Sequence, residues 1–215
     1  MRAFEDRDGV AVAELDEQER MVVARIVADV GLMLSGETFG MGDTPPLDTL
    51  QGADAILGYL RGLEEFLAEP GDPAVLRLLP NAAPTDREVS DEFRRLTEGD
   101  LRQLKVDRLR VMWQQLSEDG PEWEVTAEDA LATASALTDV RLVLASRLSL
   151  ETDEDAERLH TEIELATHAL ATDEDRELDV DHERVWLGML YQALTWLQDS
   201  LVEFLMAADG EDSHE

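Results

Sequence analysis

A helix-start signal recurs along the chain. A threonine followed three residues later by an acid occurs at Thr85/Glu88, Thr97/Asp100, Thr126/Asp129 and Thr152/Asp155. In this spacing the threonine hydroxyl accepts a hydrogen bond from a free backbone N–H of the first turn, and the acid lies beside the positive end of the helix. Asp16 and Glu19 form a related signal nearer the N-terminus. These repeated signals predict that the chain after its first fifteen residues is helical.

The first fifteen residues predict a β-hairpin instead. Residues 3–5 and 10–12 flank a turn over 6–9, and Asp8-Gly9 is a favoured turn pair because glycine accepts a positive φ. Apolar residues then recur at helical spacing from Val22 to Leu34, before Gly36 offers a stop. We therefore expect a mainly α fold, a multi-helix bundle with a small N-terminal β-hairpin.

The segment Gly36–Asp48 predicts one long loop, because it contains three glycines and a Pro-Pro pair. Two interpretations stay open: a connector between helices, or a binding loop anchored by Phe39 and Met41. An apolar helix is expected near 53–68, and a short helical piece before Pro80.

No internal repeat and no domain boundary stronger than this loop is visible. We expect a single domain over residues 1–208, which includes the hairpin at 1–15, followed by an acidic tail at 209–215.

The last helix, expected from about Asp181, is apolar on nearly three sides. Its polar positions fall on one narrow stripe, so the rest must be covered by the bundle or by a second subunit. We expect a homodimer. The candidate core or oligomer residues are Trp186, Trp196, Leu197, Leu201 and Phe204.

Charge and composition exclude several classes of protein. The chain has 50 acidic and 18 basic side chains, a formal net charge of −32, yet its hydrophobic fraction of 44% is ordinary for a globular protein. Such a surface repels phosphate backbones and anionic lipids, so no nucleic-acid or membrane partner is expected. The absence of cysteine excludes disulfides, zinc–thiolate sites and thiol nucleophiles. Since the N-terminus turns acidic at once and no long apolar run follows, a cytoplasmic protein is expected.

The basic residues gather in one segment. Seven of them lie between Arg87 and Arg110, where they predict either intramolecular ion pairs or a patch of forked donors for an acidic partner. Arg141 lies on an apolar helix stripe and needs a buried partner, which we expect on another helix as part of an ion-pair network. The candidate partner-binding or ion-pair residues are Arg77, Arg94, Arg95, Asp139, Arg141 and Arg147.

No catalytic constellation is recognisable, so we expect no catalytic, cofactor-binding or metal-ligating residue. One alternative is a di-metal carboxylate enzyme, because Glu157 precedes His160 by three residues and His160, Glu164 and His168 share a helix face. Such a site needs a second Glu-x-x-His unit, and only the imperfect pair Asp179/His182 could supply it. A further alternative is an acidic mimic of nucleic acid.

Four segments carry a family resemblance. They are Arg77-Leu78-Leu79-Pro80, Glu92 to Glu98, Asp139 to Leu148, and Trp196 to Leu201. In this order and spacing they resemble the actinobacterial domain of unknown function 2017. The resemblance implies no activity and no catalytic residue. Genes of that family often lie beside the gene of ClpS, the adaptor of the Clp protease, which suggests a link to regulated proteolysis. The sequence as a whole predicts a non-enzymatic interaction or regulatory protein with a protein partner.

Overall fold

The structure, a computed structural model, describes residues 1–35, 39, 71–83, 85–118, 120–172 and 181–212. Within these ranges the helices and strands are β1 (Glu5–Arg7), β2 (Val10–Glu14), α1 (Glu17–Ser35), α3 (Pro73–Leu78), α4 (Arg87–Leu116), β3 (Glu122–Thr126), α5 (Ala127–Arg147), α6 (Asp153–Thr172) and α7 (His182–Asp212). The predicted mainly helical fold with an N-terminal hairpin is confirmed. The expected helix near 53–68 and, apart from Phe39, the expected loop 36–48 lie outside the described residues.

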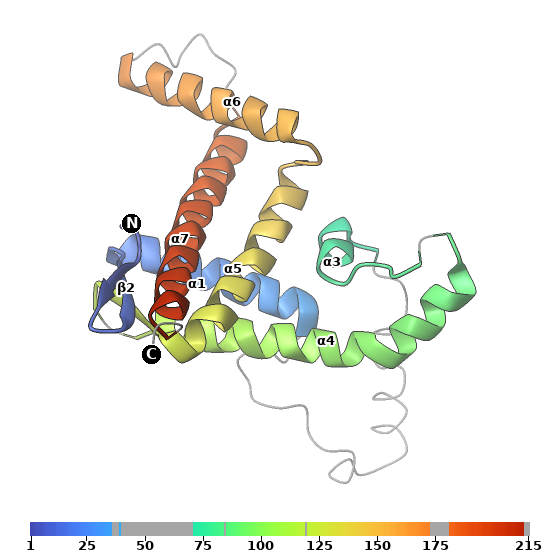
Figure 1. The fold of residues 1–215 in the computed structure, drawn as a ribbon. Helices are drawn as coiled ribbons and strands as arrows, with labels where there is room; N and C mark the ends of the chain where they lie inside the picture. The colour runs from blue at the N-terminus through green and yellow to red at the C-terminus, as the bar shows by residue number, and fades with distance from the viewer. Residues whose placement is uncertain (36–38, 40–70, 84, 119, 173–180, 213–215) are drawn as a thin grey trace, which may run out of the picture.

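The helices form two crossed layers (Figure 1). α1 packs against α4, and α5 and α7 stand side by side across them. α3 packs on α5, and α6 crosses the N-terminal end of α7. One apolar core joins the strands to α1, α3, α4, α5 and α7, with Trp123, Leu137 and Leu194 fully buried.

The sheet contains one strand more than the hairpin that was expected. The turn at Asp8 and Gly9 is confirmed, with φ of 56° and 83°, although β1 begins two residues later than predicted. β3 pairs antiparallel with β2 and places Trp123 opposite Ala13, so the prediction of helix throughout this region was wrong. The physical reason is a period of two, because Trp123 and Val125 are buried while their strand neighbours are exposed.

Most of the predicted helix starts are confirmed. Asp16 and Glu19 accept each other's backbone N–H at 2.9 and 2.8 Å, and the Thr126 hydroxyl accepts from the Asp129 N–H at 3.3 Å. Thr152 caps α6 in the same way.

Two predicted starts were wrong. Thr97 lies inside the single long helix α4, where its hydroxyl donates to the Phe93 carbonyl at 2.9 Å, a bond within the helix that competes with capping. α4 begins after Asp86, not Thr85, because the Asp86 carboxylate accepts the Val89 N–H.

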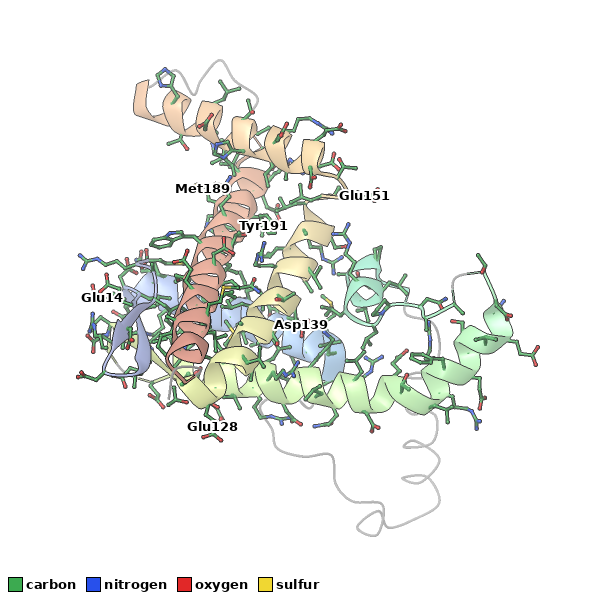
Figure 2. All side chains as sticks on the ribbon, viewed as in Figure 1. Glu14, Glu128, Asp139, Glu151, Met189 and Tyr191 are labelled. Carbon is green, nitrogen blue, oxygen red and sulfur yellow. The ribbon has the colours of Figure 1, made fainter. Side chains whose placement is uncertain are left out.

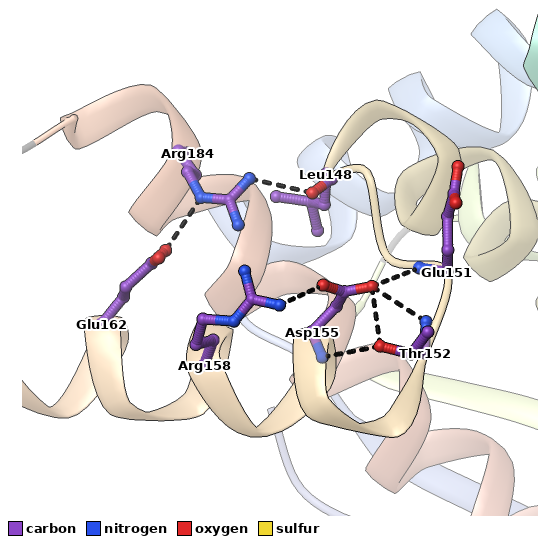
Figure 3. Close-up of polar contacts among 7 residues, drawn as sticks. All are labelled: Leu148, Glu151, Thr152, Asp155, Arg158, Glu162 and Arg184. Atoms are coloured by element: carbon purple, nitrogen blue, oxygen red, sulfur yellow. Dashed lines mark hydrogen bonds and ion pairs between the residues drawn. The ribbon is translucent and has the colours of Figure 1, made fainter.

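α6 is held at its first turn by one carboxylate (Figure 3). Asp155 accepts the backbone N–H groups of Glu151 and Thr152 at 3.0 and 2.9 Å. These bonds, with the Thr152 hydroxyl, hold the pKa of Asp155 below the ordinary carboxyl value because they favour the charged form.

A close crossing holds α6 on α7. Gly188 is buried, and a Cβ added there would lie 2.8 Å from Leu159 Cδ1 and 2.9 Å from Ile163 Cδ1. Arg184 donates at 2.8 Å both to Glu162 of α6 and to the carbonyl of Leu148 at the end of α5 (Figure 3). α6 therefore depends on a glycine contact and an arginine bridge, besides a small apolar cluster that it shares with the end of α5.

α7 runs to Asp212, four residues into the segment expected to be an acidic tail. Its buried leucines face α5. Among the described helices, none combines the length and the apolar character that a bilayer crossing requires.

Replacing Gly188 by valine should destabilise the fold by about 1–3 kcal/mol, because the branched side chain would overlap Leu159 and Ile163. Gly99→Ala is the matched control, because a Cβ at this exposed position of α4 meets nothing within 4 Å. That substitution should raise stability by about 0.5–1 kcal/mol. Urea unfolding followed by circular dichroism measures both changes, and an unchanged midpoint for Gly188→Val would contradict the close crossing.

Candidate functional site

A buried ion-pair ladder lies on the inner face of α4. Arg94 and Glu98 are only 6% and 7% exposed, and Arg94 Nε lies 3.2 Å from Glu98 Oε2. Arg102 donates to Glu98 at 2.6 Å and to the Leu34 carbonyl at 2.9 Å. The ladder therefore ties α4 to the end of α1, and Arg94 acts as a structural ion-pair residue.

Three further arginines of this segment pair with acids on the same helix. Arg95 makes two hydrogen bonds to Glu92, at 3.1 and 2.7 Å, and this contact holds the pKa of Glu92 below its usual value. Both side chains are exposed, so the pair adds little stability. Arg87 and Arg110 are likewise within 4 Å of acids on the same helix. These contacts favour the ion-pairing interpretation over a patch of free donors.

Arg77 and Arg147 hold α3 against the end of α5. Arg147 donates twice to the Asp72 carboxylate, at 3.1 and 2.7 Å, and so lowers the pKa of Asp72. Asp72 is also the N-cap of α3. Arg77 donates to the Leu150 carbonyl at 2.9 Å. Both arginines thus have partners within the chain.

Arg141 finds its partners on another helix, but they are not acids. It donates to the Gln198 side-chain oxygen and lies 5.4 Å from the centre of the Tyr191 ring, both on α7. Gln198 in turn donates to Thr138 Oγ1 at 2.6 Å. The expected ion pair is thus replaced by a hydrogen bond to an amide oxygen and a cation–π contact with an aromatic ring. Both interactions stabilise the guanidinium without burying a second charge.

Asp139 is the most deeply buried of the candidate acids, where α5 approaches α4 (Figure 2). It pairs with Lys105, the single lysine of the chain, while its Oδ2 atom is buried with no partner among the described residues. Burial raises the pKa of Asp139 above the ordinary carboxyl value, and the hydrogen bond and charge of Lys105 oppose that rise. The contact joins α4 to α5.

The six candidate residues therefore do not form one site. Arg94 and Arg95 lie in the N-terminal part of α4, and Arg77 and Arg147 lie at the contact of α3 with α5. Asp139 and Arg141 lie on α5, where Asp139 faces α4 and Arg141 faces α7.

The five candidates on α7 divide by exposure. Leu197, Leu201 and Phe204 are buried, but Trp186 and Trp196 are 49% and 48% exposed. Met189 is 50% exposed, and Figure 2 shows it on the side of α7 away from Tyr191, which faces α5. We call Trp186, Met189, Ala193 and Trp196 the tryptophan stripe. Its spacing of three, four and three residues is typical of a helix face that packs against another helix.

A groove adjoins the stripe in the angle between α6 and α7. It is an open cavity of about 340 Å³ with Leu159 and His160 on the α6 side and Gln192, Trp196 and Asp199 on the α7 side. His160 Nδ1 lies 3.1 Å from Gln192 Nε2, and His160 Nε2 lies 3.3 Å from Glu164. The tryptophan stripe and this groove together are the candidate functional site.

α4 also exposes apolar side chains. Val89, Phe93 and Leu96 are 50% to 65% exposed. Charged residues surround this row, because Arg87, Glu88, Asp91, Glu92 and Arg95 line the same hollow of α4. The groove beside the tryptophan stripe is lined by one Asp, Glu, Lys or Arg residue, Asp199. Charged residues are depleted at the centre of protein interfaces, so α7 is the better candidate.

The histidines that the structure describes do not meet in a metal centre. In the part of the chain that the structure describes, no group of three or more His, Asp or Glu side chains could hold a metal ion. Glu157, His160, Glu164 and His168 are all exposed on α6, and Asp179 lies outside the described residues. The di-metal alternative therefore gains no support from these four residues.

Sequence reasoning missed the groove. The signal that was available is the spacing of Trp196 and Asp199, which lie three residues apart and so share a helix face. Nothing in the sequence indicated that His160 would lie opposite them, because that depends on the angle at which α6 crosses α7.

The fold and the site together define a mainly helical protein with an open apolar helix face and no recognised catalytic centre among its described residues. The family described as "Domain of unknown function (DUF2017)" matches residues 1–205, so the chain belongs to this family. No curated protein and no solved structure matches the chain.

Removing Lys105 should destabilise the protein in a pH-dependent way. In Lys105→Met the buried Asp139 carboxylate loses its partner, so its pKa in the folded state should rise further above the unfolded value of about 3.8. A raised carboxyl pKa favours the folded state at low pH, and this contribution is lost as the pH rises through the folded value. The loss of stability should therefore be about 3 kcal/mol in mildly alkaline solution and smaller near the unfolded pKa.

Urea unfolding at several pH values measures this effect. The control is Lys105→Met/Asp139→Asn, which lacks the titrating group and should show a loss that does not vary with pH. Equal losses for the single variant at all pH values would contradict the buried pair.

Proposed function

We propose that the protein is a cytoplasmic interaction or regulatory protein that docks a partner protein on the tryptophan stripe and the adjoining groove. The observation that carries this proposal is the half exposure of Trp186, Met189 and Trp196 on one face of α7. In this proposal the protein acts by binding its partner and catalyses no reaction.

Exposed tryptophans of this kind favour a binding role. A tryptophan buries roughly 150–250 Å² of surface when covered, and Trp is enriched among the residues that contribute most to binding at interfaces. Trp186 and Trp196 lie three turns apart on one face, so one partner helix can cover both.

The charge of the chain indicates what kind of partner fits. At a formal net charge of −32 the molecule attracts basic proteins, and Asp199 and Glu203 are exposed next to the stripe. A second copy of the chain carries the same charge and is repelled at long range. A basic helical segment of another protein is therefore a better occupant than the homodimer expected from the sequence.

We place this binding role in Clp-dependent regulated proteolysis. The support is the gene neighbourhood of the actinobacterial family that the sequence resembles, in which the ClpS gene is a frequent neighbour. ClpS, or a substrate or regulator that it handles, is the partner to look for first.

Substitution of the stripe should weaken partner binding. We expect Trp186→Ala/Met189→Ala to recover at least about tenfold less partner than the unsubstituted chain, because two anchors of the interface are lost. Phe93→Ala is the matched control, since Phe93 is an aromatic residue of equal exposure, 50%, on α4. Affinity enrichment from cells of the source organism, with quantitative mass spectrometry, measures the difference.

The proteins that the stripe variant fails to enrich distinguish the two parts of the proposal, which are docking on the stripe and the link to Clp-dependent proteolysis. ClpS or another Clp component among the proteins lost with the stripe variant supports the proteolysis link. A basic partner unrelated to Clp supports docking and contradicts that link. Equal enrichment by all three chains, or a loss caused by Phe93→Ala alone, would contradict the stripe as the docking site.

A further inference from the structure

We propose that the groove between α6 and α7 binds an arginine side chain of the partner, with the guanidinium on the face of Trp196 and paired with Asp199. This inference rests on the proposed function, because it names the chemical group that the docking site selects.

The groove has the size and lining for one side chain. Its volume of about 340 Å³ falls at the lower end of the roughly 300–1,000 Å³ of ligand pockets. Ala156 and Leu159 contribute an apolar wall, and Leu159 is only 2% exposed. The methylene groups of an arginine can pack on this wall while the charged end reaches the rim.

The rim combines an aromatic face with a carboxylate. Trp196 is 48% exposed, and Asp199 is exposed one turn further along the same side of α7. Indole is the aromatic ring that attracts cations most strongly, and a carboxylate accepts two parallel hydrogen bonds from a guanidinium. A planar guanidinium can do both, whereas an ammonium group makes neither the stacking nor the forked contact.

The opposite wall carries an acid of its own. His160 Nδ1 lies 3.1 Å from Gln192 Nε2, and Glu164 Oε1 lies 3.3 Å from His160 Nε2. On α6, Arg158 already pairs with Asp155 at 2.6 Å. Asp199 therefore lines the groove and Glu164 lies beside its wall, in a chain with a formal net charge of −32.

The chain itself contains a precedent for this contact. Tyr191 lines the same groove and holds the Arg141 guanidinium over its ring at 5.4 Å, from the α5 side. Arg141 adds its bond to Gln198 on the same helix. The pairing of a guanidinium with a ring and an oxygen acceptor on α7 is thus already used once within the fold, and Trp196 with Asp199 offers the same combination to the outside.

A titration without any partner tests the inference. The probe is N-acetyl-arginine amide, added to the full ¹⁵N-labelled chain while the indole N–H resonances of its four tryptophans are followed by NMR. The resonances are assigned with single Trp→Phe variants. We expect a saturable shift of the Trp196 signal, with a dissociation constant on the order of millimolar to tens of millimolar, and no shift of buried Trp123. N-acetyl-citrulline amide, the neutral isostere, should cause no saturable shift.

Two variants of equal charge change complete the design. Asp199→Asn should weaken arginine binding about threefold to fivefold. Glu203→Gln, on the next turn of the same helix, should leave it within about twofold. The inference is overturned by the absence of a saturable Trp196 shift, by equal binding of citrulline, or by equal effects of the two variants.

The two proposals fail separately. If arginine does not bind but the stripe variant still loses its partner, the docking role stands and the arginine site is wrong. If arginine binds but the stripe variant keeps its partner, the groove is a cation site and the docking role of the stripe is wrong.

Discussion

The packing of α7 against α5 is the contact on which the rest of the structure depends. α7 has apolar residues on nearly three sides, and α5 covers the side that carries Leu190, Leu194 and Leu197. α6 covers a second side, where Gly188 lets the two helices approach closely. The third side, with Trp186 and Trp196, is left half exposed by the described residues. The candidate site is thus a direct consequence of a helix with more apolar surface than the described elements around it cover.

The scarcity of basic residues explains how charge is distributed between the interior and the surface of the protein. With 18 basic side chains against 50 acidic ones, several arginines pair with acids of their own chain. Arg94, Arg95 and Arg147 pair with Glu98, Glu92 and Asp72. The first two pairs lie within α4, whereas Arg147 joins α5 to the start of α3 and Lys105 joins α4 to α5. Positive charge is thus paired within the fold, and the net charge of −32 leaves the exterior strongly negative. This is the physical reason to expect a basic partner on an apolar face, and not an acidic partner on an arginine patch.

Local signals in the sequence predicted local structure well. The turn at Asp8-Gly9 and the caps at Thr126 and Thr152 are confirmed, because turn and capping geometry depend on residues within a few positions. β3 was missed because its alternation spans only five residues and its partner strand β2 is far away in the chain. Thr97 was read as a cap, although its hydroxyl bonds within the continuous helix.

The site depends on contacts between helices, which the sequence does not encode locally. The residues of α7 were identified as packing candidates, but which of them would be covered depends on where α5 and α6 lie. The position of α6 follows from the Gly188 contact and from the Arg184 bonds to Glu162 and the Leu148 carbonyl. Only those contacts bring His160 opposite Trp196.

The most direct test of the account is the solution mass of the full chain. Sedimentation velocity at micromolar concentration should give one species near 24.0 kDa in low and in high salt, because like charge keeps two copies apart when salt is low and the stripe serves a basic partner. A stable dimer in low salt that Trp186→Ala/Met189→Ala dissociates would contradict the account, because the stripe would then be the contact between two copies.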